Sequence, residues 1–138
     1  MEQLIDLATQ GHCKNSPSVV VVLNALELKN LPDEYWYARL KYCAMSGYVS
    51  ECPDVVEALN ALELKTLPEA YWYTFLEYCG SVGYIKTSPQ VAEALKALNL
   101  TVPPKIYWYT LFKYCNSQTY QVTHPVVVET LRALGLPI

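Results

Sequence analysis

The chain has 138 residues, a length that suits one domain with a substantial core. Its formal net charge is −3, from 10 basic and 13 acidic residues, and this balance does not favour a protein built to cover nucleic-acid phosphates. No apolar run approaches the roughly 18–20 residues that a membrane-spanning helix needs, so no membrane span is expected. The first residues are acidic and lack arginine, and they predict neither a secretory signal nor a transit peptide.

Apolar spacing along the chain predicts helices of two kinds. In residues 53–64, Val55, Ala58, Leu59 and Leu62 fall on one helical face, and a proline occupies the first position, where its missing N–H costs nothing. The position before that proline holds serine in two units, Ser16 and Ser88, and serine is a good N-cap. We call helices of this kind the short helices.

The second kind is rich in aromatic residues, and we call these the aromatic helices. Residues 68–82 open with proline and glutamate, which are start signals, and Gly83 can take the left-handed conformation that ends a helix. Strands are not expected, because the apolar residues recur every three to four residues rather than every second residue. In chain order the expected helices span 2–10, 17–28, 32–46, 53–64, 68–82, 89–100, 104–118 and 125–135.

The sequence repeats itself every 36 residues. The tripeptide Tyr-Trp-Tyr begins at Tyr35, Tyr71 and Tyr107, and all 12 tyrosines fall into columns with this period. A fixed period of this size indicates a repeat architecture. We therefore expect one all-α domain over 1–138, a right-handed α-solenoid of antiparallel hairpins. It consists of a half unit (1–16), full units (17–52, 53–88, 89–124) and a half unit (125–138).

A helical wheel predicts which columns of the repeat are buried. The centre of the buried stripe, at the seam between units, holds six residues: Trp36, Trp72, Trp108, Cys43, Cys79 and Cys115. The columns 38/74/110, 41/77/113 and 45/81/117 lie opposite and are expected to be solvated. Cysteines locked to the period indicate buried, reduced thiols and hence a reducing compartment. The small column Ala25, Ala61, Ala97 and Ala133 is expected to let neighbouring helices approach closely.

Two surfaces are candidates for binding. The terminal units are more apolar than the others, although isolated solenoids usually carry polar end caps. Either the short helix at 2–10 folds over one end or a partner covers these surfaces. We expect a partner at one end at least, on a surface formed by Val19, Val20, Val21, Val126 and Val128. A polar ligand face is expected from Asn24, Asn60, Lys96 and Arg132 on the short helices and from Lys41, Glu77 and Lys113 on the aromatic helices.

Catalytic and metal-binding patterns are missing from the sequence. The chain has two histidines, far apart in sequence, and neither the cysteine spacings nor any Ser/His/acid set matches a zinc site or a nucleophilic triad. We expect a non-enzymatic protein without a cofactor or metal.

The stretch Leu59-x-Ala61-Leu62, followed by a proline and an aromatic helix, resembles the octotricopeptide and heptatricopeptide repeats of organelles. Those repeats pair an L-x-A-L stretch with a P-P-x-x-W element, and Pro103-Pro104-Lys105-Ile106-Tyr107-Trp108 is similar with one residue more. The resemblance implies a helical-repeat subunit of a mitochondrial or plastid assembly, or an organellar RNA-binding protein.

The expected function is a scaffold or adaptor that contacts other protein subunits in a larger assembly, for which the resemblance implies a mitochondrial setting. The alternative is RNA binding within an organellar ribonucleoprotein, which the acidic balance disfavours. High internal identity also fits a consensus-designed repeat protein, but irregular choices such as Cys13, Cys52 and Met45 argue against one.

Overall fold

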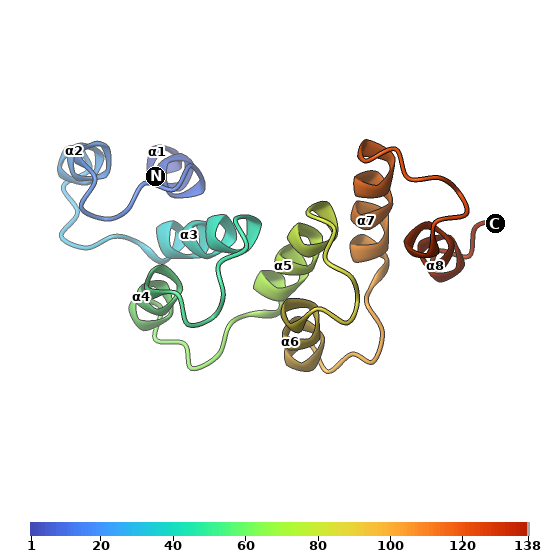
Figure 1. The fold of residues 1–138 in the computed structure, drawn as a ribbon. Helices are drawn as coiled ribbons and strands as arrows, with labels where there is room; N and C mark the ends of the chain where they lie inside the picture. The colour runs from blue at the N-terminus through green and yellow to red at the C-terminus, as the bar shows by residue number, and fades with distance from the viewer. Residues whose placement is uncertain (138) are drawn as a thin grey trace. The chain divides into compact units, whose positions relative to one another are not determined.

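A computed structural model describes residues 1–137 of the chain. The described residues form α-helices and no strand, as expected (Figure 1). In chain order they are α1 (Glu2–Thr9), α2 (Pro17–Ala25), α3 (Asp33–Met45), α4 (Pro53–Ala61), α5 (Glu69–Ser81), α6 (Pro89–Ala97), α7 (Lys105–Ser117) and α8 (Pro125–Ala133). None of the described helices is long and apolar enough to cross a membrane.

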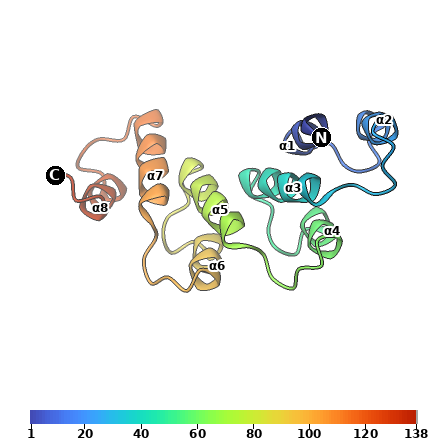
Figure 2. The same ribbon diagram turned by 180° about the vertical axis from the view of Figure 1, so that it is seen from behind.

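The chain forms two compact units, Met1–Tyr71 and Trp72–Ile138, and α5 begins in the first and continues into the second. In the first unit α1 packs against α2 and α3, and α3 packs against α4. In the second unit α7 packs against α8. Both views show a single loop joining α3 to α4 and α7 to α8 (Figures 1 and 2). The single domain over 1–138 stays a prediction.

The short helices α2, α4, α6 and α8 begin at the expected prolines but end two or three residues earlier than predicted. The cause is a left-handed residue after each helix, at Glu27, Glu63, Asn99 and Gly135. After α2, the Glu27 N–H donates to the Asn24 carbonyl and the Leu28 N–H donates to the Leu23 carbonyl. This is the Schellman motif. Sequence reasoning missed it because glutamate rarely adopts a positive φ.

The aromatic helices end in the same motif, and here glycine marks it. Gly47 and Gly83 have φ of 77° and 85°, and Thr119 takes their place after α7 with φ 57°. The expected end at Gly83 is confirmed. At the other ends, Ser16 and Ser88 stand at N-cap positions without a side-chain capping bond, whereas the His124 side chain accepts one from the Val126 N–H at 3.2 Å.

The core is built from the aromatic helices. The first tyrosine of each Tyr-Trp-Tyr element and its tryptophan are buried, while the second tyrosine is about half exposed. Two expectations are wrong. Column 38/74/110 is not solvated: Ala38 is buried and Thr110 faces Gly80 of α5. The column of Ala25, Ala61, Ala97 and Ala133 is exposed rather than packed between helices.

Candidate binding surfaces

Each unit carries a shallow groove on its short helices, and the two grooves are lined by equivalent residues. The groove in the first unit, called the Trp36 groove, has a volume of about 610 Å³ and is lined by Lys14, Trp36, Pro53, Val56, Glu57, Asn60 and Ala61. The groove in the second unit, called the Trp108 groove, has about 620 Å³ and is lined by Lys86, Thr87, Leu95, Thr101, Val102, Pro103, Trp108, Glu129, Arg132 and Ala133.

Five lining positions correspond at a distance of 72 residues, which is twice the sequence period. They carry a lysine, a tryptophan, a glutamate, an alanine and one variable polar residue. The variable position holds Asn60 in the Trp36 groove and Arg132 in the Trp108 groove. A recurring surface of this kind can hold recurring elements of an extended ligand.

An ion pair sits at the rim of each groove. Lys14 Nζ lies 3.3 Å from Glu57 Oε2, and Lys86 Nζ lies 2.8 Å from Glu129 Oε2. All four side chains are partly exposed, so each pair adds at most about 1 kcal/mol to stability. The pairs matter more for recognition, because each glutamate neutralises a lysine that would otherwise attract a phosphate group.

The expected polar ligand face falls on two different sets of helices. Asn24, Asn60, Lys96 and Arg132 are all exposed on short helices, and two of them line the grooves. Lys41, Glu77 and Lys113 are exposed on the aromatic helices, and none of them lines either groove. The structure therefore separates one predicted face into a groove set and an aromatic-helix set.

The aromatic-helix set lies beside exposed tyrosines. Tyr37, Tyr73 and Tyr109 are 39–50% exposed. Each precedes Lys41, Glu77 or Lys113 by four residues, which places tyrosine and charge on one helical face. This tyrosine column is only half buried because the helix turns its Trp side, not its Tyr37 side, toward the core.

The expected partner surface is also only partly exposed. Val20 and Val21 of α2 are exposed, Val21 to 66%, but Val19 is fully buried and cannot contribute. Val126 and Val128 are half-buried on α8. The wheel of α2 explains the error, since an apolar run of four residues must place at least one member toward the core.

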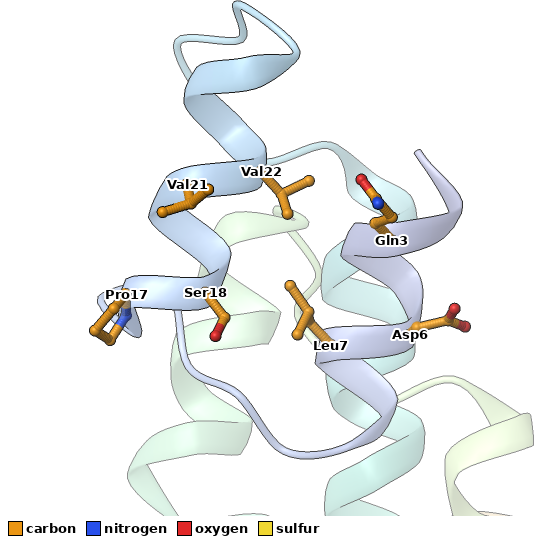
Figure 3. Close-up of a pocket in the computed structure, with 7 residues that line it drawn as sticks. All are labelled: Gln3, Asp6, Leu7, Pro17, Ser18, Val21 and Val22. Carbon is orange, nitrogen blue, oxygen red and sulfur yellow. The ribbon is translucent and has the colours of Figure 1, made fainter.

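A third groove, of about 520 Å³, lies between α1 and α2 and is called the α1–α2 groove. Figure 3 shows Leu7 of α1 and Val22 of α2 extending into the space between the two helices. Its rim is formed by Gln3, Asp6, Pro17, Ser18 and Val21. This end of the first unit thus presents an apolar floor with a mixed rim.

Arg39 is a buried charge that sequence analysis missed. Its side chain is almost fully buried, its Nη2 lies 3.5 Å from Asp54 Oδ2, and its Nη1 has no hydrogen-bond partner. Its guanidinium carbon lies 5.6 Å from the centre of the Tyr42 ring. The sequence contains a signal that this position is buried, because the equivalent positions of the repeat hold the apolar residues Phe75 and Leu111.

The six residues expected at the seam between units are all buried, and the three cysteines among them are free thiols. Burial raises the pKa of Cys43 to about 11 and that of Cys79 to about 12. These thiols are protonated at neutral pH and are poor nucleophiles. Among the described residues, no group of three or more His, Cys, Asp or Glu side chains is placed to hold a metal ion.

Comparison with known proteins places the chain in no family. No protein-family model matches the sequence, and no curated protein matches it significantly.

Proposed function

We propose that the chain is a non-catalytic helical-repeat scaffold that binds an extended segment of a partner protein along its short helices. The observation that carries the proposal is the equivalence of the Trp36 and Trp108 grooves, which repeat the same tryptophan, alanine and Lys–Glu pair. A ligand with regularly spaced side chains matches such a surface better than a compact small molecule does.

The same reasoning favours a right-handed α-solenoid with a 36-residue repeat. The short helices α2, α4, α6 and α8 begin 36 residues apart. In both units a tyrosine hydroxyl also donates to a carbonyl 23 residues earlier, as in Tyr35 to His12 and Tyr107 to Tyr84. Recurrence of one packing contact supports recurrence of one hairpin geometry.

The chemistry of the grooves favours a polypeptide ligand. The floor is formed by a tryptophan edge and an alanine, which suits an apolar side chain. The paired rim charges can exchange hydrogen bonds with a peptide backbone without demanding a net charge on it. The resemblance to organellar repeats favours a mitochondrial assembly as the setting, and the buried thiols favour a reducing compartment.

RNA binding is the second candidate, and one observation favours it. Lys96 and Arg132 are exposed on short helices and belong to the same sequence column as Asn24 and Asn60. Two positive charges supply few phosphate contacts, and the groove lysines are already paired with glutamates. The protein ligand is therefore the preferred assignment.

Site-specific photo-crosslinking tests the proposal. A photoreactive amino acid placed at Asn60 or Arg132, in cells that express the chain naturally, should yield discrete protein adducts that resist ribonuclease. Positions Lys41 and Lys113 serve as matched controls, because they are exposed but lie outside both grooves. Adducts formed only at the control positions would refute groove binding.

Purified chain distinguishes the RNA alternative. Fluorescence anisotropy with single-stranded RNA at an ionic strength of about 0.15 M should show no binding that falls steeply with added salt. Ribonuclease-sensitive adducts at Arg132, together with salt-dependent RNA binding, would replace the scaffold assignment with the RNA one.

A further inference from the structure

Three contacts join the end of one aromatic helix to the hairpin that follows it. In the first, the lysine of the connecting loop pairs with a glutamate 43 residues later, as in Lys14–Glu57 and Lys86–Glu129. This contact occurs once in each compact unit. We call its two sides the loop side, which carries the lysine, and the hairpin side, which carries the glutamate.

In the second contact, a glycine on the loop side meets a tyrosine ring on the hairpin side. A Cβ built on Gly11 would lie 2.6 Å from Cζ of Tyr42, and one built on Gly83 would lie 2.5 Å from Cζ of Tyr114. A side chain at these glycines is therefore incompatible with the tyrosine ring.

The third contact brings two aromatic helices together. A Cβ on Gly80 of α5 would lie 2.6 Å from the Tyr107 carbonyl oxygen and would also collide with Thr110 of α7. Gly80 stands on the loop side of this contact, and Thr110 stands on the hairpin side.

On the hairpin side formed by α1 and α2, the equivalent positions are exposed, and two of them, Asp6 and Val21, border the α1–α2 groove (Figure 3). Three residues there differ from their equivalents in the repeat. Val21 occupies the repeat position that holds glutamate in Glu57 and Glu129. Asp6 occupies the position of the tyrosine in the second contact, and Glu2 occupies the position of Thr110. Val21 is 66% exposed at the rim of the groove.

On the loop side after α7, the equivalent positions are exposed as well. Val122 stands where Lys14 and Lys86 stand and is 72% exposed. Thr119 replaces the glycine of the second contact, and Asn116 replaces Gly80. Both of these residues are exposed.

The changes at the two ends match each other pair by pair. Lysine and glutamate both become valine, so Val122 and Val21 can bury apolar surface together. Glycine becomes threonine where tyrosine becomes aspartate, and a small Asp6 removes the ring that Thr119 could not accommodate.

The third pair shows a different change. Its loop-side column holds Ala8, Ala44, Gly80 and Asn116, and its hairpin-side column holds Glu2, Ala38, Thr74 and Thr110, so both end positions carry the largest side chain of their column and can form a polar pair. At the second contact, a threonine facing a tyrosine ring would collide with it, whereas Thr119 facing Asp6 keeps the two sides complementary.

We propose that the loop side at the C-terminal end of one copy docks on the α1–α2 groove of a second copy, head to tail, with Val122 against Val21. The two surfaces belong to different ends of the chain, so the interface is heterologous and leaves a free surface on each copy. The products are therefore head-to-tail chains, or rings in which every junction is filled. Because the Trp36 and Trp108 grooves are not part of this contact, the inference does not depend on the proposed function.

Charge swaps that restore the Lys–Glu pair test the proposal by sedimentation velocity over a concentration series. Wild-type protein should associate reversibly, with larger species at higher concentration. V122K and V21E should each lower the association constant by about tenfold or more, because a charge faces an apolar partner at the junction. M45K is the matched control, since Met45 is 50% exposed on α3 and lies outside the junction and the three grooves, and it should associate like wild type.

An equimolar mixture of V122K and V21E is the decisive sample. One junction in the mixture then carries the Lys–Glu pair of the repeat and the other keeps both valines, so association should return. The V21E/V122K double variant should also associate by itself.

A wild-type chain that stays monomeric at about 1 mM would overturn the proposal. Association that survives in both single variants, or that the mixture does not restore, would overturn it as well. Circular dichroism of each variant checks that the helices are retained, and the recovery in the mixture cannot arise from unfolded protein.

Discussion

The Tyr107 hydroxyl donates a 2.5 Å hydrogen bond to the backbone carbonyl of Tyr84, the residue that follows the left-handed Gly83 at the end of α5. Tyr35 makes the equivalent bond to His12 at 2.7 Å, and the Tyr71 hydroxyl donates to the Tyr48 carbonyl. The first tyrosine of each Tyr-Trp-Tyr element thus ties an aromatic helix to the turn that ends the one before it. Both partners recur with the sequence period, so the same bond is made three times along the chain.

Removal of this hydroxyl should weaken the fold. Y107F leaves the Tyr84 carbonyl without its donor and should lower the free energy of unfolding by about 1–2 kcal/mol. Y109F, on the exposed tyrosine two residues later, should change it by less than about 0.5 kcal/mol. Urea denaturation measures both values, and equal losses in the two variants would show that the hydrogen bond is not responsible.

Alkaline pH should destabilise the protein through its buried phenols. Burial raises the pKa of Tyr35 from 10.0 to about 12. Above about pH 10 the unfolded chain releases this proton while the folded chain still holds it. The contribution of Tyr35 to the free energy of unfolding is therefore fully present below pH 10 and is lost as pH rises toward 12.

The slope for one such group is up to about 1.4 kcal/mol per pH unit. Lysines also titrate in this range, so the informative quantity is the difference between wild type and Y35F, measured by urea denaturation. The Y35F curve should fall less steeply with pH, and parallel curves would contradict the assignment.

Gly80 should not tolerate even a methyl group. G80A would normally gain about 1 kcal/mol from helix propensity. Here the added Cβ meets the Tyr107 carbonyl and Thr110 of α7, so a net loss of about 1–3 kcal/mol is expected. S81A, at the exposed neighbouring position, isolates the propensity effect. A stabilised G80A variant would show that α5 and α7 are not in close contact.

Thr119 should be a strained residue. It is β-branched and has φ 57° at a position where the equivalent residues are glycine. T119G should raise the free energy of unfolding by about 1–2 kcal/mol, because glycine has no Cβ to strain. The reverse change, G83T, should be strongly destabilising, since it adds both the strain and the collision with Tyr114. Thermal and urea unfolding of dilute samples measure both changes.

The ion pair between the buried Arg39 and the half-exposed Asp54 should not be needed for stability, but loss of Asp54 alone should be costly. R39M replaces the charge by an apolar chain of similar length, and stability should stay level or rise by about 1–4 kcal/mol. D54A leaves Arg39 buried without its carboxylate and should lose about 1–3 kcal/mol. Restored stability in the R39M/D54A double variant would confirm that the unpaired charge causes the loss.

Sequence reasoning could predict the number and kind of helices because prolines, leucine spacing and the Tyr-Trp-Tyr columns report local structure. It misjudged the ends of the short helices because the left-handed residue is Glu27 or Glu63 rather than glycine. It placed Lys41 and Asn60 on one ligand face, although they lie on helices of different kinds. A helical wheel fixes positions within one helix and carries no information about which neighbour covers which side.

The sequence by itself determined an all-helical chain with a 36-residue period and buried tryptophans, since backbone propensity and apolar spacing act over a few residues. Only the tertiary structure decided which columns meet. It paired Lys14 with Glu57 and placed Tyr42 on Gly11, contacts between residues more than 30 positions apart. These contacts show which columns face each other at the positions equivalent to Val21, Val122, Asp6 and Thr119, because they depend on how helices distant in sequence pack together rather than on neighbours in sequence.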